Sequence, residues 1–194
     1  MATIDIGACI SGGIAIFKRN PVFHIVGSIL IYIVSQFSFG LLQGPMMVGY
    51  YRALNKEDAG GKAELGDLFK GFDDFVPALV AALVGAIVVT IGYFLCIIPG
   101  MLLVAILPTA LCLVADGEKD GINALKRAWM AVKSNLVMAA VAMLVIGLLT
   151  MVGLIACCVG ILITAPIGMA SSHLLAKQIM AGEGAVAADG STQA

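Results

Sequence analysis

The sequence predicts an all-α protein, a polytopic helical membrane bundle, because of its composition and the placement of its charges. Hydrophobic residues make up 61% of the 194 residues and charged residues 12%, whereas soluble domains average about 45–50% and about 25%. A soluble protein of this size cannot bury so much apolar surface. In addition, the stretches 20–51, 75–115 and 134–176 contain no charged residue. Both observations point to a lipid bilayer around these stretches.

An amphipathic segment precedes each charge-free stretch. The three segments read GGIAIFKRNPVFHIVGS, AELGDLFKGFDDFVPALVAA and NALKRAWMAVKSNLVMAAVAM. Each leads through one lysine into an apolar run, and these lysines are Lys18, Lys70 and Lys133. One helical face of the third segment collects its large apolar side chains: Ile122, Leu125, Trp129 and Val132. This pattern is typical of a helix in the membrane interface; the alternative is a solvated linker that caps the bundle.

The two longer charge-free stretches each predict a pair of membrane spans. A spanning helix needs about 20 apolar residues, so stretches of 41 and 43 residues hold two spans each. Gly and Pro interrupt helices, and they place the turns at CIIPG, 96–100, and CCVG, 157–160.

The first stretch, 20–51, has 32 residues and leaves two interpretations open. In the first interpretation, one span crosses the membrane and a partly inserted helix follows it. In the second, two short spans cross the membrane. Two crossings place all eleven basic residues on one side, as the positive-inside rule favours. We therefore expect six spans with both termini cytoplasmic: 21–36, 40–54, 76–95, 101–115, 136–156 and 161–180.

The run GLLQGPMMVGYYRALNK, 40–56, interrupts an apolar stretch with a Gly-Pro pair. We expect Gly44 and Pro45 to lie early in the second span, where a kink can shape a binding cavity. Pro99 and Gly100 mark a second break. Small residues four apart, such as Gly40 and Gly44, allow helices to pack closely within one chain or between copies in a homo-oligomer.

The amphipathic segments and hairpins together predict one integral membrane domain, residues 1–182, with a threefold internal repeat. The expected units are 5–56, 57–116 and 117–182, and a disordered tail follows at 183–194 because this segment is rich in small and polar residues. Since each unit begins and ends on the same side of the membrane, the repeats are parallel and not inverted.

Several short motifs resemble those of a known group of proteins. They are GPMMVGYYRALNKEDAGGKAELGDLFKGF, IIPGMLLVAILP and ADGEKDGINALKRAWMAVKSN. The chain resembles, up to about residue 180, bacterial multi-pass membrane proteins of no established activity. It also resembles the membrane domain attached to some glycerophosphodiester phosphodiesterases. Ala128 departs from the pattern, which has Ser there. The resemblance implies the bacterial inner membrane and no hydrolase activity, since the catalytic domain is absent from the sequence.

The predicted spans offer little chemistry. They contain no Asp, Glu, Lys or Arg in their interiors, and such residues mark ion pathways and intramembrane enzymes. His24 is expected at the interface, and His173 is expected to bond Ser171, Ser172 or a neighbouring helix. No catalytic motif, metal site or Cys–His pair is indicated, so we expect no enzyme activity and no cofactor. A net charge of −1 gives no field for binding nucleic acid.

The remaining function classes are those of non-enzymatic membrane proteins. The first hypothesis is a scaffold, partner subunit or membrane-organising factor that contacts the lipid bilayer, anionic lipid or a membrane protein through basic side chains of the third amphipathic segment: Lys126, Arg127 and Lys133. The second is a permease for a neutral or apolar small molecule. This molecule would enter the protein between the repeat units, near the prolines that break the helices. A weaker third is an accessory to a lipid-modifying enzyme.

Overall fold

Every element of the computed structural model is a helix within the residues that it describes, which are 4–95, 100, 103–155 and 158–190. The predicted all-α fold is therefore confirmed. Pro99 and most of the predicted turn 96–100 lie outside the described residues, as does the first residue of the predicted turn 157–160.

The helices follow the predicted order of an amphipathic segment and then two apolar helices. In chain order they are α1 (Ile6–Arg19), α2 (Pro21–Phe37), α3 (Gln43–Asp58), α4 (Leu65–Phe69), the 3-10 helix η1 (Lys70–Asp74), α5 (Phe75–Leu95), α7 (Ile106–Ala115), α8 (Gly121–Ser134), α9 (Leu136–Ile155) and α10 (Cys158–Gly190). Each predicted span corresponds to one helix, with shifted ends. α10 continues to Gly190, into the segment 183–194 for which the sequence predicts disorder.

Polar side chains at the joints explain where the helices begin. Asn20 ends α1 and caps α2, because its side chain accepts a hydrogen bond from the Phe23 N–H and Pro21 occupies the first turn. Asp120 caps α8 in the same way. The turn between α2 and α3 contains Phe39 and Gly40 with positive φ values of 50° and 82°, a conformation that Gly adopts without strain.

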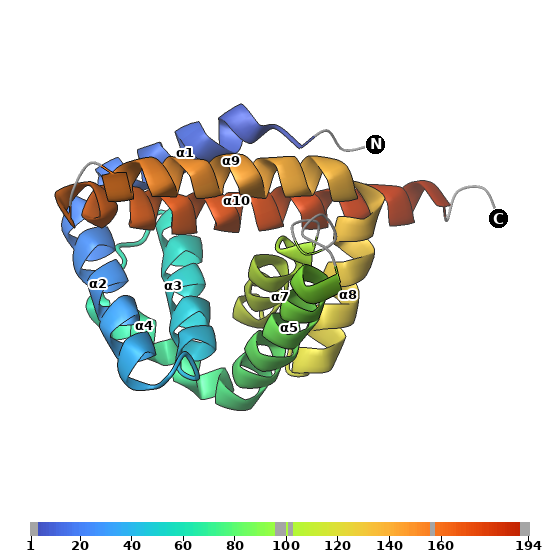
Figure 1. Cartoon of the computed structure of the whole chain (residues 1–194), viewed down its shortest axis with the longest axis horizontal. Helices are drawn as coiled ribbons and strands as arrows, with labels where there is room; N and C mark the ends of the chain where they lie inside the picture. The colour runs from blue at the N-terminus through green and yellow to red at the C-terminus, as the bar shows by residue number, and fades with distance from the viewer. Residues whose placement is uncertain (1–3, 96–99, 101–102, 156–157, 191–194) are drawn as a thin grey trace.

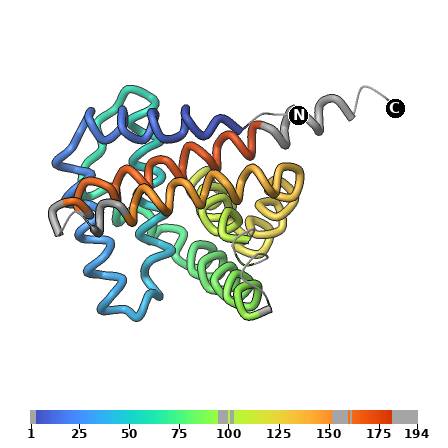
Figure 2. The backbone as a smooth tube through the Cα atoms, turned by 45° about the horizontal axis from the view of Figure 1, so that its top comes forward, coloured from blue at the N-terminus to red at the C-terminus, as the bar shows by residue number. Residues whose placement is uncertain are grey.

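The helices form two layers that cross. α1, α9 and α10 run side by side along one side of the molecule, and α2, α3, α5 and α7 extend away from them (Figure 1, Figure 2). The chain passes between the layers at two sharp joints, a bend of 103° between α1 and α2 and one of 100° between α8 and α9. This arrangement does not confirm the predicted membrane bundle of three hairpins.

Length and composition identify one helix among the described residues that can cross a membrane. It is the continuous helical run Leu65–Phe94, whose charges all precede α5. The number rises to three if each of the two bent pairs, α1–α2 and α8–α9, counts as one span. α7 is apolar but short. The membrane character of the chain is thus supported by one to three spans, and six spans are not confirmed.

The outer faces of α2, α5 and α9 carry large apolar side chains that no other part of the described structure covers. They include Val22, Tyr32 and Phe37 on α2, Val76, Ile87 and Phe94 on α5, and Val137, Leu148 and Met151 on α9. Soluble monomers rarely expose contiguous apolar patches of this extent. These faces suit contact with lipid.

Candidate functional site

α3 lies at the centre of the molecule, and two glycines allow its close contacts. An added Cβ at Gly44 would lie 2.7 Å from the Ala78 carbonyl of α5, and one at Gly49 would clash with the Leu68 backbone of α4. Gly44 and Gly49 therefore pack this chain internally, whereas an added Cβ at Gly40 would meet nothing within 4 Å. Pro45 does not kink the helix as expected: α3 begins at Gln43, so Pro45 lies in the first turn, where its missing N–H is not needed.

A cavity of about 590 Å³ lies between the α2–α3 turn, α3, α5 and α7. Its volume falls in the range of about 300–1,000 Å³ that is usual for small-molecule sites. Its lining is mostly aliphatic and includes Gly44, Met47, Leu83, Ile87, Leu107 and Pro108. The sequence singled out Gly44 and the prolines of the broken helices, and the cavity adjoins Gly44 and Pro108.

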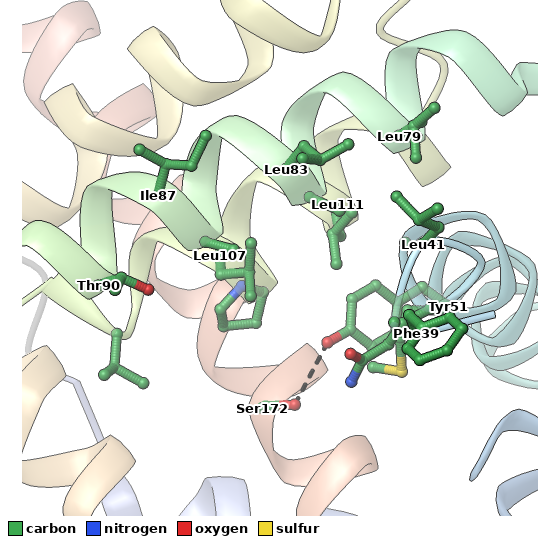
Figure 3. A pocket seen from close by; sticks show the side chains of 18 of the residues that line it. Phe39, Leu41, Tyr51, Leu79, Leu83, Ile87, Thr90, Leu107, Leu111 and Ser172 are labelled. Atoms are coloured by element: carbon green, nitrogen blue, oxygen red, sulfur yellow. Dashed lines mark hydrogen bonds between the residues drawn. The ribbon is translucent and has the colours of Figure 1, made fainter. Parts of the chain in front are cut away.

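The polar groups in the cavity wall are uncharged. The Tyr51 hydroxyl lies 3.3 Å from Ser172 Oγ of α10, and this pair faces the row of α5 side chains that begins at Leu79 and ends at Thr90 (Figure 3). Gln43 and Thr90 also line the cavity, and both are exposed. The site thus combines an apolar volume with a small hydrogen-bonding spot on one wall.

His173 lies beside this spot and is fully buried. Its Nδ1 atom is 3.5 Å from Cys112 Sγ of α7, and the centroids of its ring and that of Tyr51 are 4.9 Å apart. The expected bond to a neighbouring helix is thus present, but the sequence indicated no Cys–His pair. The partners are 61 residues apart, so no local motif marks them. No hydrogen-bond partner for His173 Nε2 lies in the described structure.

His24 belongs to a second cluster and is fully buried, and its expected position at the membrane interface stays a prediction. Its Nδ1 atom is 2.9 Å from the Tyr50 hydroxyl, and its Nε2 atom is 3.3 Å from Glu57 Oε2, with poor hydrogen-bond alignment. The Asn20 amide donates to Glu57 Oε1 over 3.4 Å and to the Ala63 carbonyl over 3.3 Å. Sequence reasoning missed this cluster, since Glu57 was assigned to the region beyond the span.

Three aspartates each lie between two basic side chains. Arg19 and Lys177 flank Asp58, Lys56 and Lys70 flank Asp67, and Arg52 and Lys119 flank Asp74. Burial raises the pKa of Asp67, but hydrogen bonds from Lys70 and Lys56 outweigh it and lower the pKa to about 2. Hydrogen bonds from Lys119 and Arg52 hold the pKa of Asp74 below its usual value. These clamps tie α3 to α1, α4, η1 and α10.

The predicted basic face of α8 is only partly available. Arg127 pairs with Glu118 over 2.8 Å, whereas Lys126 and Lys133 are exposed and have no ion pair within the described residues. The predicted apolar face is split: Leu125 and Val132 are buried, but Ile122 and Trp129 are 50% and 41% exposed. α8 therefore presents an apolar strip, formed by Ile122 and Trp129, on the same exposed side of the helix as Lys126 and Lys133.

The last predicted site residue that the structure describes, Gly100, is buried against Tyr93. No group of three or more His, Cys, Asp or Glu side chains within the described ranges is arranged to hold a metal ion. No protein-family model, curated protein or solved structure matches the chain. The resemblance to bacterial multi-pass membrane proteins therefore stays an expectation.

Proposed function

We propose that the chain is a non-enzymatic integral membrane protein that binds a neutral, largely apolar small molecule and acts as a permease for it. The cavity between α3, α5 and α7 is the observation that carries this proposal. Its aliphatic lining suits an apolar ligand. The exposed α5 side chains along it, such as Leu83 and Ile87, would let such a ligand enter from the lipid.

The scaffold hypothesis explains the cavity less well. A scaffold needs surfaces for its partners and gains nothing from an apolar pocket of about 590 Å³, whose walls forfeit packing contacts. A tightly packed bundle would have argued against a permease, and this objection does not apply here. We retain the scaffold role only for α8.

The membrane arrangement that we propose keeps the six spans in three parallel units, in a bacterial inner membrane, with both termini in the cytoplasm. The pairs α2–α3, α5–α7 and α9–α10 would be the hairpins. The charge-free stretches 20–51, 75–115 and 134–176, which make up most of these pairs, support this arrangement.

Reporter fusions test this topology. We expect fusions near Glu57 and Gly184 to report the cytoplasm and a fusion near Pro99 to report the opposite side. Paired alkaline phosphatase and fluorescent protein reporters at each site provide the measurement. A fusion near Glu57 that reports the outside would exclude the α2–α3 hairpin.

Filling the cavity tests the binding function. Ala86 and Val88 are both exposed on α5, but only Ala86 lines the cavity. We expect Ala86→Phe to weaken binding of an environment-sensitive apolar fluorophore at least about tenfold, because the ring occupies ligand volume. Val88→Phe should bind as the unmodified chain does.

The measurement is fluorophore titration with the purified chain in nanodiscs, followed by flux of the same compound across liposomes. Equal affinities of the Ala86→Phe and Val88→Phe variants would contradict the cavity as the site. Binding of the fluorophore without flux across liposomes would show that the chain is a binding protein and not a permease.

A second candidate function, contact with anionic lipid, is favoured by the strip on α8. Trp129, the single tryptophan of the chain, lies on it and provides a direct probe. We expect brominated phosphatidylglycerol in nanodiscs to quench Trp129 more strongly than brominated phosphatidylcholine, because Lys126 and Lys133 attract anionic headgroups.

Matched variants test the contribution of the two lysines to lipid binding separately from that of Arg127. Neutralising Lys126 and Lys133 with glutamine should remove the preference for the anionic lipid. Arg127→Gln should change it less, since Arg127 already pairs with Glu118. Equal quenching by the two lipids in the unmodified chain would exclude this role.

A further inference from the structure

The hydrogens of the two cavity hydroxyls can be assigned from their partners. Ser172 Oγ donates its single hydrogen to the Met169 carbonyl over 2.8 Å. The 3.3 Å contact between the two hydroxyls must then use the hydrogen of Tyr51. Each hydroxyl has one hydrogen and two lone pairs. Both hydrogens are therefore in use, and only acceptor lone pairs are left for a ligand.

The surroundings restrict the ligand to an uncharged one. The side chains that line the cavity carry no charge, so an ionised ligand group would lose its hydration without gaining a counterion. Tyr51 is almost fully buried and Ser172 is 8% exposed, so the pair is largely shielded from bulk water. A polar ligand group must supply what the pair lacks, which is a donated hydrogen.

The cavity also limits the size of the ligand. At about 30 Å³ for each water-sized group, the volume of about 590 Å³ accommodates roughly 20 such groups. The wall opposite the hydroxyl pair is a row of aliphatic side chains, Leu79, Leu83 and Ile87 (Figure 3). One hydrocarbon chain with a small headgroup fits this volume.

We propose that the ligand is a neutral single-chain amphiphile whose headgroup donates a hydrogen bond, such as a long-chain alcohol or primary amide. Tyr51 and Ser172 select it by accepting that hydrogen. This inference rests on the proposed function, since it needs the cavity to be a binding site. It adds the chemical class of the ligand and the two residues that determine specificity.

Competition between matched ligands tests the inference in the full chain in nanodiscs. Hexadecanol and hexadecyl methyl ether have the same chain, but only the alcohol donates a hydrogen. We expect hexadecanol to displace the apolar fluorophore about three- to tenfold more effectively than the ether. Hexadecanoate, which is ionised at neutral pH, should displace it less effectively than hexadecanol.

Two variants assign the selection to the hydroxyl pair. Tyr51→Phe keeps the ring beside His173 but removes the acceptor, so the preference for the alcohol should fall and binding of the ether should be unchanged. Ser172→Ala frees the Tyr51 hydrogen, so binding of the ether should improve relative to the alcohol. Thr90→Val, at the exposed polar group on the opposite wall, should leave the preference unchanged.

The outcomes separate this inference from the proposed function. Equal displacement by alcohol and ether, stronger displacement by hexadecanoate, or an unchanged preference in both Tyr51→Phe and Ser172→Ala would overturn the ligand class. The cavity would still be a binding site in each case. Failure of the unmodified chain to bind the fluorophore would instead overturn the proposed function. Melting temperatures of the variants identify any that fail to fold.

Discussion

Gly71→Ala is expected to destabilise the protein by about 3 kcal/mol or more. Gly71 lies in η1 against the first turns of α3, and an added Cβ would lie 1.9 Å from the Pro45 carbonyl oxygen and 2.5 Å from the Gly49 amide nitrogen. Both are backbone atoms, so no side-chain rotation relieves the overlap. η1 and α3 would have to move apart, which disturbs the α3 wall of the cavity.

Gly66→Ala is the matched control, because it lies one helix earlier and an added Cβ there meets nothing within 4 Å. We expect it to be neutral or slightly stabilising, since Ala favours a helix over Gly. Thermal unfolding is measured through the reaction of the buried thiols of Cys9 and Cys112 with a fluorogenic maleimide. Similar melting temperatures for Gly71→Ala and the unmodified chain would contradict the close contact between η1 and α3.

The helices themselves could be predicted because their causes are local. Uncharged runs, a capping Asn20 or Asp120, and Gly or Pro at the breaks are readable in a window of a few residues. For this reason each predicted span corresponds to one of the observed helices. Pro45 shows the limit of such local signals. A proline in the first turn of a helix is tolerated, whereas one in the interior kinks the helix, and the sequence did not show at which residue α3 begins.

The relation between the helices could not be predicted from the same signals. A charge-free run specifies apolar surroundings, and both lipid and a neighbouring helix provide them. The hydropathy of α9 is therefore equally compatible with a span parallel to α5 and with the observed crossing layer. Similarly, Cys112 and His173 are each ordinary in an apolar helix, and only the packing of α7 on α10 brings them together.

In α8, the residues that are buried differ in part from those that the sequence pattern placed on the apolar face. Its large apolar residues share one side of a helical projection, but the buried side consists of Leu125 and Val132 together with the small residues Ala124, Ala128 and Ala131. Close packing of helices favours small side chains at the contact. Trp129 is consequently left outside, beside the lysines, where it suits a lipid interface.

Glu57→Ala is expected to lower the free energy of unfolding by about 2–3 kcal/mol. Glu57 is 7% exposed and its contact residue His24 is fully buried. Removing the carboxylate takes away the group that lies 3.3 Å from the buried His24 Nε2, and a buried polar group without its partner retains its full desolvation cost. The half-buried Asn20 amide loses one of its two acceptors and keeps the Ala63 carbonyl. Asn20 also caps α2, so the joint between α1 and α2 should loosen with it.

Asp58, the neighbouring carboxylate, provides the control for this prediction. Unfolding is again measured through the reaction of the buried thiols with the maleimide. Asp58 pairs with Arg19 and Lys177 but is 33% exposed, so Asp58→Ala should cost below about 1 kcal/mol. The variant that combines His24→Phe with Glu57→Leu should recover most of the loss, because an apolar pair leaves no buried group unsatisfied. If Asp58→Ala proved as costly as Glu57→Ala, the exposed charge pairs that join α3 to α1 and α10 would stabilise the protein as much as the buried cluster, and the prediction would be wrong.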